Sequence, residues 1–283
     1  MAQQAAREAG SYLMAHFGPN HTLNNKNDTP SGISSRFDGD SSEIIIRALL
    51  AQWFEAYPQT DVLIVSEESE APVLAARRDE RSFQQTPYTG NVRDWEGMCW
   101  VLDPICGSIG YARGIRDFII SIALVCANEA LVGVVYDPSH DEIFYAARRG
   151  GAYLNGTVIS PAKTERLSEA VVSVEHEFYR SAPLESIRKI ACVVRRLRTA
   201  MTCALELCYV ACGRLDAVVK LNQAFYDYIG GALILTEALG GTQGLIRIED
   251  GQPVLPFRFL GSRTGFYGTN GLVLEELKRV LLE

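Results

Sequence analysis

An apolar run that ends in an acidic turn constrains the fold of this chain more than any other stretch. Residues 99–102 read Cys-Trp-Val-Leu, and Asp103, Pro104 and a small-residue turn at Gly107-Ser108 follow. The pattern predicts a buried strand that stops at a tight turn. In α/β folds such turns present side chains and free backbone N–H groups to a ligand. We therefore expect the functional site at this turn.

Two further carboxylates lie at the ends of apolar elements. Glu67 follows a short predicted strand at 62–66, and Asp227 precedes an apolar helical pattern at 228–239. A single such carboxylate is most often a surface group or a helix cap. Buried together with Asp103, however, they would repel one another strongly unless a cation neutralised them. Hard oxygen ligands suit Mg²⁺ or Mn²⁺, and ions held in this way commonly activate water for attack on phosphorus.

The bulk composition excludes several classes of protein. The 283 residues are 47% hydrophobic and 22% charged, which is typical of a globular chain with a sizeable core. The net charge of −7 argues against a nucleic-acid polymer as partner. Seven cysteines without a C-x-x-C pair favour free thiols in a reducing cytosol. No apolar run approaches the roughly 18 residues of a membrane span and no signal peptide is visible, so we expect a cytoplasmic protein without membrane contact.

The order of the predicted elements indicates a mixed α/β fold. Residues 20–40 are predicted to form a loop, and residues 70–96 an irregular surface excursion. Helices are expected at 2–17, from residue 40 or 41 to 57, and at 195–212, 228–239 and 272–282, and strands at 62–66, 118–126, 131–136, 142–147, 171–174, 217–219 and 265–269. Strands and helices mixed in this way are layered against each other in α/β proteins.

Three ordered motifs carry a resemblance to a known family. They are residues 63–69 (LIVSEES), 100–108 (WVLDPICGS) and 225–241 (FYDYIGGALILTEALGG), with 133–138 (GVVYDP) and 151–156 (GAYLNG) between them. The chain resembles the inositol monophosphatase family over nearly its whole length. The second motif of that family reads WVIDPIDGT, and the third reads WDxAAGxxIxxEAGG.

The resemblance implies a fold and an activity. The fold would be an α/β five-layer αβαβα sandwich, with an N-terminal subdomain at 1–155 that carries the first two motifs. A C-terminal subdomain at 156–283 would carry the third motif. The activity would be that of a Mg²⁺-dependent, Li⁺-sensitive phosphomonoesterase that hydrolyses a small phosphorylated sugar, polyol or nucleotide. Mn²⁺ or another divalent ion is an alternative cofactor, and the family is usually homodimeric.

The motifs also imply roles for individual residues. The implied metal ligands are Glu67, Asp103, Asp227 and the carbonyl of Ile105, with Asp103 shared between two ions. The implied catalytic residues are Glu67, Asp38 and Ser108, where Ser108 replaces the family's threonine and Asp38 is its partner in orienting the attacking water. The implied substrate-binding residues are Gly107, Ser108, Cys203, Lys220 and Asp227, with the N–H groups of Gly107 and Ser108 cradling the phosphate.

Cys106 departs from the family's pattern, because it replaces an aspartate that binds the second metal. A thiol is a soft, weaker ligand for Mg²⁺ and is mostly protonated at neutral pH unless a metal or cation lowers its pKa. Three interpretations stay open: a weak second metal and a slow enzyme, a softer ion such as Mn²⁺ or Zn²⁺ with Cys106 as ligand, or an impaired protein that binds a phosphorylated ligand or a partner. Cys106 is not expected to be a nucleophile, since six residues separate it from Arg113 where the cysteine phosphatases need five.

Two other departures concern the substrate. Met201 replaces a glycine of the family's G-[ST] pocket signature, and Lys220 replaces a glutamate that contacts sugar hydroxyls in inositol phosphatases. Met201 fits ordinary helix packing equally well, and Lys220 fits a solvated strand end equally well. If Lys220 faces the pocket, its charge favours a substrate with a second anionic group over a neutral polyol.

Overall fold

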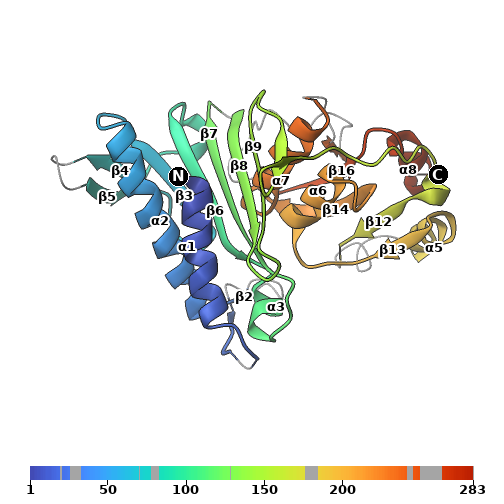
Figure 1. The fold of residues 1–283 in the computed structure, drawn as a ribbon, viewed down its shortest axis with the longest axis horizontal. Helices are drawn as coiled ribbons and strands as arrows, with labels where there is room; N and C mark the ends of the chain where they lie inside the picture. Colours follow the sequence, from blue (N-terminus) through green and yellow to red (C-terminus); the bar gives the residue numbers. More distant parts are fainter. Residues whose placement is uncertain are drawn as a thin grey trace.

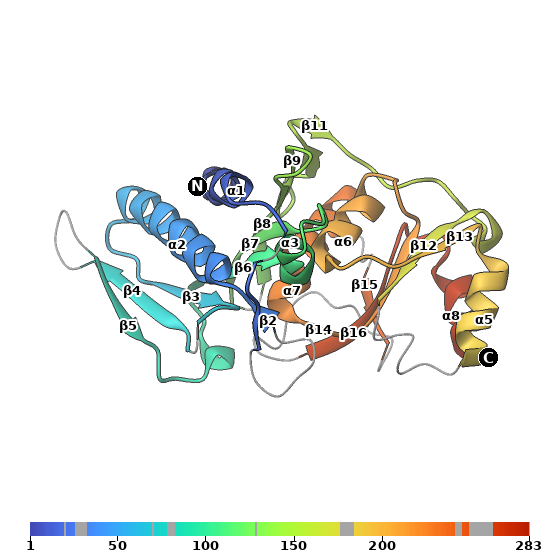
Figure 2. The ribbon, with the colours of Figure 1, turned by 90° about the horizontal axis from the view of Figure 1, so that it is seen from below.

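Layers of helix and sheet alternate through the molecule, as Figure 1 shows. The structure is a computed structural model that describes residues 1–19, 21–25, 33–69, 71–77, 83–127, 129–175, 184–240, 245–248 and 263–282. The first helical layer is α1 (Ala2–Ala15) with α2 (Arg36–Ala56), the central one is α6 (Cys203–Ala211) with α7 (Phe225–Ala238), and the last is α5 (Leu184–Val193) with α8 (Leu274–Leu282). Two sheets separate these layers (Figures 1 and 2). The predicted five-layer αβαβα sandwich is confirmed.

The larger sheet places two of the predicted site residues side by side. Its order is β11 (Thr157–Val158), β10 (Ala152–Leu154), β9 (Glu142–Ala147), β8 (Glu129–Asp137), β7 (Ile119–Cys126), β6 (Met98–Cys106), β3 (Val62–Ser66), β4 (Val73–Arg77) and β5 (Phe83–Pro87). Neighbouring strands are antiparallel except β3 and β6, which are parallel with Ser66 opposite Leu102. Because the two strands run in the same direction, Glu67 and Asp103 directly follow this pair and lie side by side at the carboxyl end of β3.

The smaller sheet positions the third carboxylate, Asp227, through one of its strands. Its order is β13 (Arg196–Arg198), β12 (Val171–Val174), β14 (Ala217–Ala224), β16 (Arg263–Thr269) and β15 (Leu245–Arg247). Helix α7 begins at the residue after β14, so Asp227 lies in its first turn. The two-stranded β1 (Asn24–Asn25) and β2 (Ile33–Ser34), and the short α3 (Ser108–Ala112), complete the surroundings of the site.

Helix α7 is buried almost all round between the two sheets. It packs against β7 and β8 on one side and against α6 on the other. Two glycines permit this close approach, since a Cβ on Gly230 would lie 2.9 Å from Ser121 Oγ, and one on Gly231 would lie 2.6 Å from the carbonyl oxygen of Ala204. The packing fixes the position of Asp227 relative to the larger sheet.

The predicted boundary of the second helix is wrong by about one turn. Helix α2 begins at Arg36 rather than at residue 40 or 41, and Ser35 is its N-cap. The Asp38 carboxylate accepts hydrogen bonds from the Ser35 N–H and hydroxyl, both at 2.7 Å, and Ser35 Oγ accepts one from Phe37 N–H at 3.3 Å. This Ser-x-x-Asp pattern is a helix-start signal inside a segment predicted to be loop. Residues 26–32 of that segment lie outside the described residues.

Two other segments also differ from their predictions. Within 70–96, β4 and β5 form an antiparallel hairpin that widens the larger sheet, although the prediction was an irregular excursion. Residues 70 and 78–82 of it lie outside the described residues. Within 195–212, the predicted single helix is instead strand β13, a loop and helix α6, because Arg196 and its neighbours pair in parallel with β12. Helix α5 was not predicted. Among the described helices, none combines the length and apolarity that a membrane span needs.

Candidate metal centre

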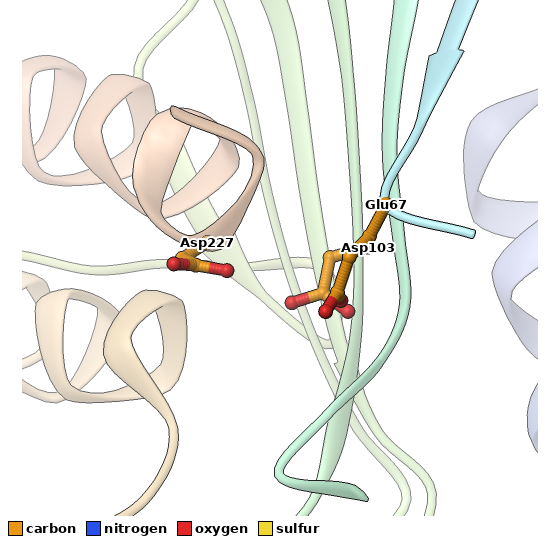
Figure 3. A group of neighbouring side chains, drawn as sticks. All are labelled: Glu67, Asp103 and Asp227. Atoms are coloured by element: carbon orange, nitrogen blue, oxygen red, sulfur yellow. The ribbon is translucent and has the colours of Figure 1, made fainter. Parts of the chain in front are cut away.

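Three carboxylates from separate elements converge at the ends of β3 and β6, two central strands of the larger sheet. Glu67 follows β3, Asp103 lies in β6, and Asp227 lies in the first turn of α7. One oxygen of each lies within 4.8 Å of the others. Figure 3 shows Glu67 and Asp103 beside each other, with Asp227 facing them from the helix. The structure thus brings together the three carboxylates that the sequence singled out.

The environment of Asp103 is unfavourable for a carboxylate that has no cation beside it. Its side chain is fully buried, and neither of its oxygens has a hydrogen-bond partner. Burial, and then the charges of Glu67 and Asp227, raise its pKa well above the usual range. Burial and the charge of Glu67 raise the pKa of Asp227 to about 7, although the Ala224 N–H donates to its carboxylate at 3.0 Å. A fully buried, unpartnered carboxylate flanked by two further carboxylates fits a divalent cation such as Mg²⁺.

Asp38 and Ser108 are in direct contact beside this cluster. Ser108 Oγ lies 2.7 Å from Asp38 Oδ1 and 2.9 Å from the carbonyl oxygen of Ile105, to either of which it can donate its single proton. The other Asp38 oxygen is held by Ser35 in the N-terminal cap of α2. The pairing that the resemblance implied is therefore present, and helix α2 fixes its orientation. The catalytic roles of these residues remain predictions.

The turn between β6 and α3 requires a glycine. Gly107 has a φ of +95°, and a Cβ there would lie 2.5 Å from the carbonyl oxygen of Asp117 and 3.1 Å from Thr202 Cγ2. The turn is thus pressed against the loop that precedes α6. Thr202 directly precedes Cys203, the buried first residue of α6. The predicted phosphate turn therefore lies next to the start of this helix.

Cys106 is buried at the end of β6, and its thiol contacts the Asp103 carboxylate. Among the residues that the structure describes, no group of three converging ligand atoms includes its Sγ. Burial, and then the charges of Asp103 and Asp227, raise the pKa of its thiol well above the usual value. Its role as a metal ligand remains a prediction.

Lys220 does not lie at a solvated strand end, and that interpretation is wrong. It is only 2% exposed in β14, and its ammonium group forms an ion pair with Glu206 of α6, which is 1% exposed. Glu206 also accepts a hydrogen bond from the Ser173 hydroxyl. Because Glu206 balances the lysine, Lys220 offers no net charge to a second anionic group. The single carboxylate in the apolar sequence of α6 was a visible signal for a buried partner, and we did not predict it.

Met201 is not packed in a helix, so that interpretation is wrong as well. It lies in the loop before α6 and is 42% exposed. Its N–H donates to Asp117 Oδ2 at 3.2 Å, and its side chain covers Gly110 of α3, where a Cβ would lie 3.0 Å from Met201 Cε. Asp117, which also accepts from the Thr202 hydroxyl at 3.2 Å, holds this loop against the turn at Gly107. Sequence reasoning did not identify Asp117.

The fold and the acidic centre define a class of protein: an αβαβα sandwich that carries a cluster of three carboxylates at a strand end. Comparison with known proteins narrows the class. The model of the inositol monophosphatase family matches residues 1–270, and the chain belongs to this family.

Individual relatives agree with this assignment. An inositol-1-monophosphatase of Bacillus subtilis is 33% identical over 62% of this chain and 65% of its own length, so the match spans slightly less than two thirds of that relative. The Nus factor SuhB of Xylella fastidiosa is 30% identical over 84% of this chain and 78% of its own length. Among solved structures, Thermotoga maritima IMPase is 26% identical with a TM-score of 0.75, over 99% of this chain and 94% of that one.

The metal-free protein should lose stability as the pH rises. Asp103 and Asp227 have pKa values raised above those of an unfolded chain, so their contribution is fully favourable below about pH 4 and is lost as pH passes through the folded values, near 7 for Asp227. We expect a lower urea midpoint in EDTA at pH 8.5 than at pH 5.5, and a smaller difference for Asp227→Asn. A midpoint in EDTA that is higher at pH 8.5 would contradict this account of the cluster.

Proposed function

We propose that the protein is a metal-dependent phosphomonoesterase that acts on a small phosphorylated sugar, polyol or nucleotide. The observation that carries the proposal is the fully buried, unpartnered carboxylate of Asp103 between Glu67 and Asp227. Such a group is costly unless it binds a cation. Family membership supports the same activity, since several relatives are named inositol monophosphatases.

Different residues of the chain would bind the metal ion, orient the attacking water and hold the phosphate. Glu67, Asp103, Asp227 and the Ile105 carbonyl would hold a divalent ion, Mg²⁺ or Mn²⁺, which when bound activates water and balances phosphate charge. Asp38 would accept the hydrogen bond of the Ser108 hydroxyl, which would leave lone pairs on Ser108 Oγ to accept a hydrogen bond from the attacking water and orient it. The N–H groups of Gly107 and Ser108 would donate to phosphate oxygens.

Ser108→Ala should lower kcat without a large change in KM, because the orienting hydroxyl acts on the water rather than on the substrate. We expect a loss of about 10²-fold, the order seen when a reacting group is misplaced by about 1 Å. Ser108→Thr is the matched control, since it keeps the hydroxyl and should retain most of the activity. Full kcat in Ser108→Ala, measured by phosphate release at saturating substrate, would remove this residue from the mechanism.

The substrate class is tested by a panel of phosphate esters. The purified protein would be assayed for inorganic phosphate release from sugar phosphates, polyol phosphates including inositol phosphate, and nucleotides, each with Mg²⁺ and with Mn²⁺. The balanced charge of Lys220 gives no reason to favour doubly anionic substrates, so neutral polyol phosphates stay within the proposal. Absence of release from every ester with both metals would overturn the proposed function.

A second candidate is a catalytically impaired member that binds a phosphorylated ligand or a partner protein. The thiol of Cys106 favours it, because a thiol is a weaker ligand for Mg²⁺ than a carboxylate. This candidate predicts that phosphate esters raise the melting temperature without being hydrolysed. It also predicts that Cys106→Asp gains hydrolysis, whereas the enzyme hypothesis predicts turnover in the wild-type protein. Cytoplasmic location and the absence of a nucleic-acid polymer as partner also remain predictions, supported by the composition.

We further propose that the protein is a homodimer, and that an apolar patch beside the site contacts the second copy. The patch consists of Ile109, Ile115 and Met201, which are 40%, 50% and 42% exposed; Ile109 precedes Gly110, the Met201 side chain covers it, and the carbonyl oxygen of Ile115 lies near it. Exposed apolar groups gathered in this way mark interaction surfaces. Ile115→Glu should therefore shift the mass measured by light scattering toward that of a monomer, while the exposed Val158→Glu should not. A monomeric wild-type protein would exclude the dimer.

A further inference from the structure

Strand β14 carries a β-bulge shortly before it leads into α7. Residues 220–223 of β14 pair with residues 264–266 of β16, so β14 has one residue more than its partner here. Gly265 of β16 makes room for the bulge, because a Cβ there would lie 2.7 Å from the carbonyl oxygen of Leu221. Bulges next to functional sites redirect side chains, and this one lies a few residues before Asp227.

A buried carboxylate holds the bulge in shape. Glu175 directly follows β12 and is 5% exposed. It accepts hydrogen bonds from the N–H groups of Leu221 and Asn222, the latter at 3.3 Å, and from the side-chain amide of Gln223. These bonds satisfy backbone groups that the bulge withdraws from the ladder between the strands. The orientation of the exposed Asn222 is therefore set from the protein interior.

Asn222 in turn holds the guanidinium group of Arg263. Arg263 Nε donates to Asn222 Oδ1 at 3.1 Å, and Nη2 donates to the Asn222 carbonyl oxygen at 2.9 Å. Both acceptors are neutral, and within the described ranges Arg263 pairs with no carboxylate and its Nη1 donates to no group. The exposed guanidinium thus keeps its charge and two N–H donors for a ligand. Lys220, by contrast, is balanced by Glu206.

Arg263 lies beside the predicted metal centre. It is the residue of β16 that pairs with Ala224, whose N–H donates to the Asp227 carboxylate. The Cβ atoms of such paired residues are about 5 Å apart. Burial raises the pKa values of Tyr226 and Asp227, and the charge of Arg263 opposes that rise at both residues. A positive group held in a fixed orientation therefore borders the side of the centre that α7 forms.

We infer that Arg263 is a specificity-determining residue that binds a second anionic group of the substrate, a phosphate or a carboxylate. The preferred substrate is then a phosphate ester that carries such a group in addition to the phosphate that is released. A guanidinium group fits both anions, because its N–H groups match the spacing of their oxygens. This inference rests on the proposed function and names its substrate class.

The test compares esters that differ in the second anionic group. Glycerol 3-phosphate is paired with 3-phosphoglycerate, and glucose 1-phosphate with glucose 1,6-bisphosphate, each with Mn²⁺. In the wild type, we expect the KM of the doubly anionic ester to be about tenfold lower than that of its partner, the value of one charge-assisted hydrogen bond. In Arg263→Gln the two KM values should become similar, while kcat changes little, because Arg263 contacts a part of the substrate that does not react.

Arg148→Gln is the matched control, since Arg148 is another exposed arginine and pairs with Glu129. It should keep the wild-type ratio of KM values. Equal KM values within both pairs in the wild type, or a wild-type ratio retained in Arg263→Gln, would overturn the inference. A ratio lost equally in Arg148→Gln would also overturn it, because the effect would then come from net charge.

Calorimetric titration with the same esters separates this inference from the proposed function. Tighter binding of the doubly anionic esters that is lost in Arg263→Gln supports the inference even if no phosphate is released, a result that would reject the proposed function. Phosphate release with equal KM and Kd values within each pair does the reverse. Absence of binding by every ester would reject both.

Discussion

Asp103→Asn is expected to abolish phosphate release and, at the same time, to stabilise the metal-free protein. The loss of activity should reach about 10³-fold, the upper end of the range seen when a charge-stabilising group is removed from a reaction centre. The gain in stability arises because an amide replaces a fully buried carboxylate that has no donor and lies against Glu67 and Asp227. We expect about 1–2 kcal/mol at pH 8 in EDTA, since an unpaired buried charge costs more than an unpaired buried amide.

A variant that loses activity while its free energy of unfolding rises has lost a functional group, because a damaged fold would lower both. The matched control is Asp137→Asn, a change at another buried aspartate whose carboxylate accepts the N–H groups of Ser139 and His140 at 2.9 and 3.2 Å. That variant should keep its phosphate release and gain less stability than Asp103→Asn, because the Asp137 carboxylate has hydrogen-bond donors although burial also raises its pKa. If Asp103→Asn instead retained activity, or if it unfolded at a lower urea concentration in EDTA, Asp103 would not be the central ligand of a metal site.

Lys220→Met is expected to destabilise the fold by about 3–5 kcal/mol, the cost of leaving one partner of a buried ion pair uncompensated. The variant would leave Glu206 buried with the Ser173 hydroxyl as its remaining partner among the described residues. Urea unfolding followed by fluorescence measures the change. A partial recovery is expected in the double variant Lys220→Met with Glu206→Met, because two apolar side chains of similar length need no counter-charge.

An exposed ion pair provides the comparison for this experiment. Arg148 and Glu129 form a pair whose side chains are 39% and 40% exposed. Arg148→Met should therefore cost less than about 1 kcal/mol, as is usual for surface pairs. A cost for Lys220→Met no larger than that for Arg148→Met would show that the Lys220 ammonium does not depend on Glu206 for its burial.

The acidic centre could be predicted because its signals are local. Each carboxylate lies at the end of an apolar run. The parallel pairing of β3 with β6 places two of these carboxylates, Glu67 and Asp103, side by side. The third arrives because Asp227 lies in the first turn of α7, directly after β14. The layered fold followed from the resemblance of the motifs. The pairing of Asp38 with Ser108 was implied by that resemblance alone.

What could not be predicted depends on contacts between distant elements. Lys220 is buried only because Glu206 of another element meets it, and neither residue reveals the other in the sequence. The hairpin of β4 and β5 exists because β3 offers an edge for pairing, which outweighs the polar composition of the segment. The start of α2 is different, because the capping pattern of Ser35 and Asp38 is local and can be read from the sequence.

The most direct test of the proposed metal-dependent hydrolysis follows bound metal and activity in the same titration. Protein stripped of metal with EDTA would be titrated with Mn²⁺, and bound ion and phosphate release from the best ester of the panel would be measured at each step. The account predicts no release without metal, and a rate that rises in proportion to ion bound and is lost in Asp103→Asn. Release that persists without metal, or full binding without any release, would contradict it.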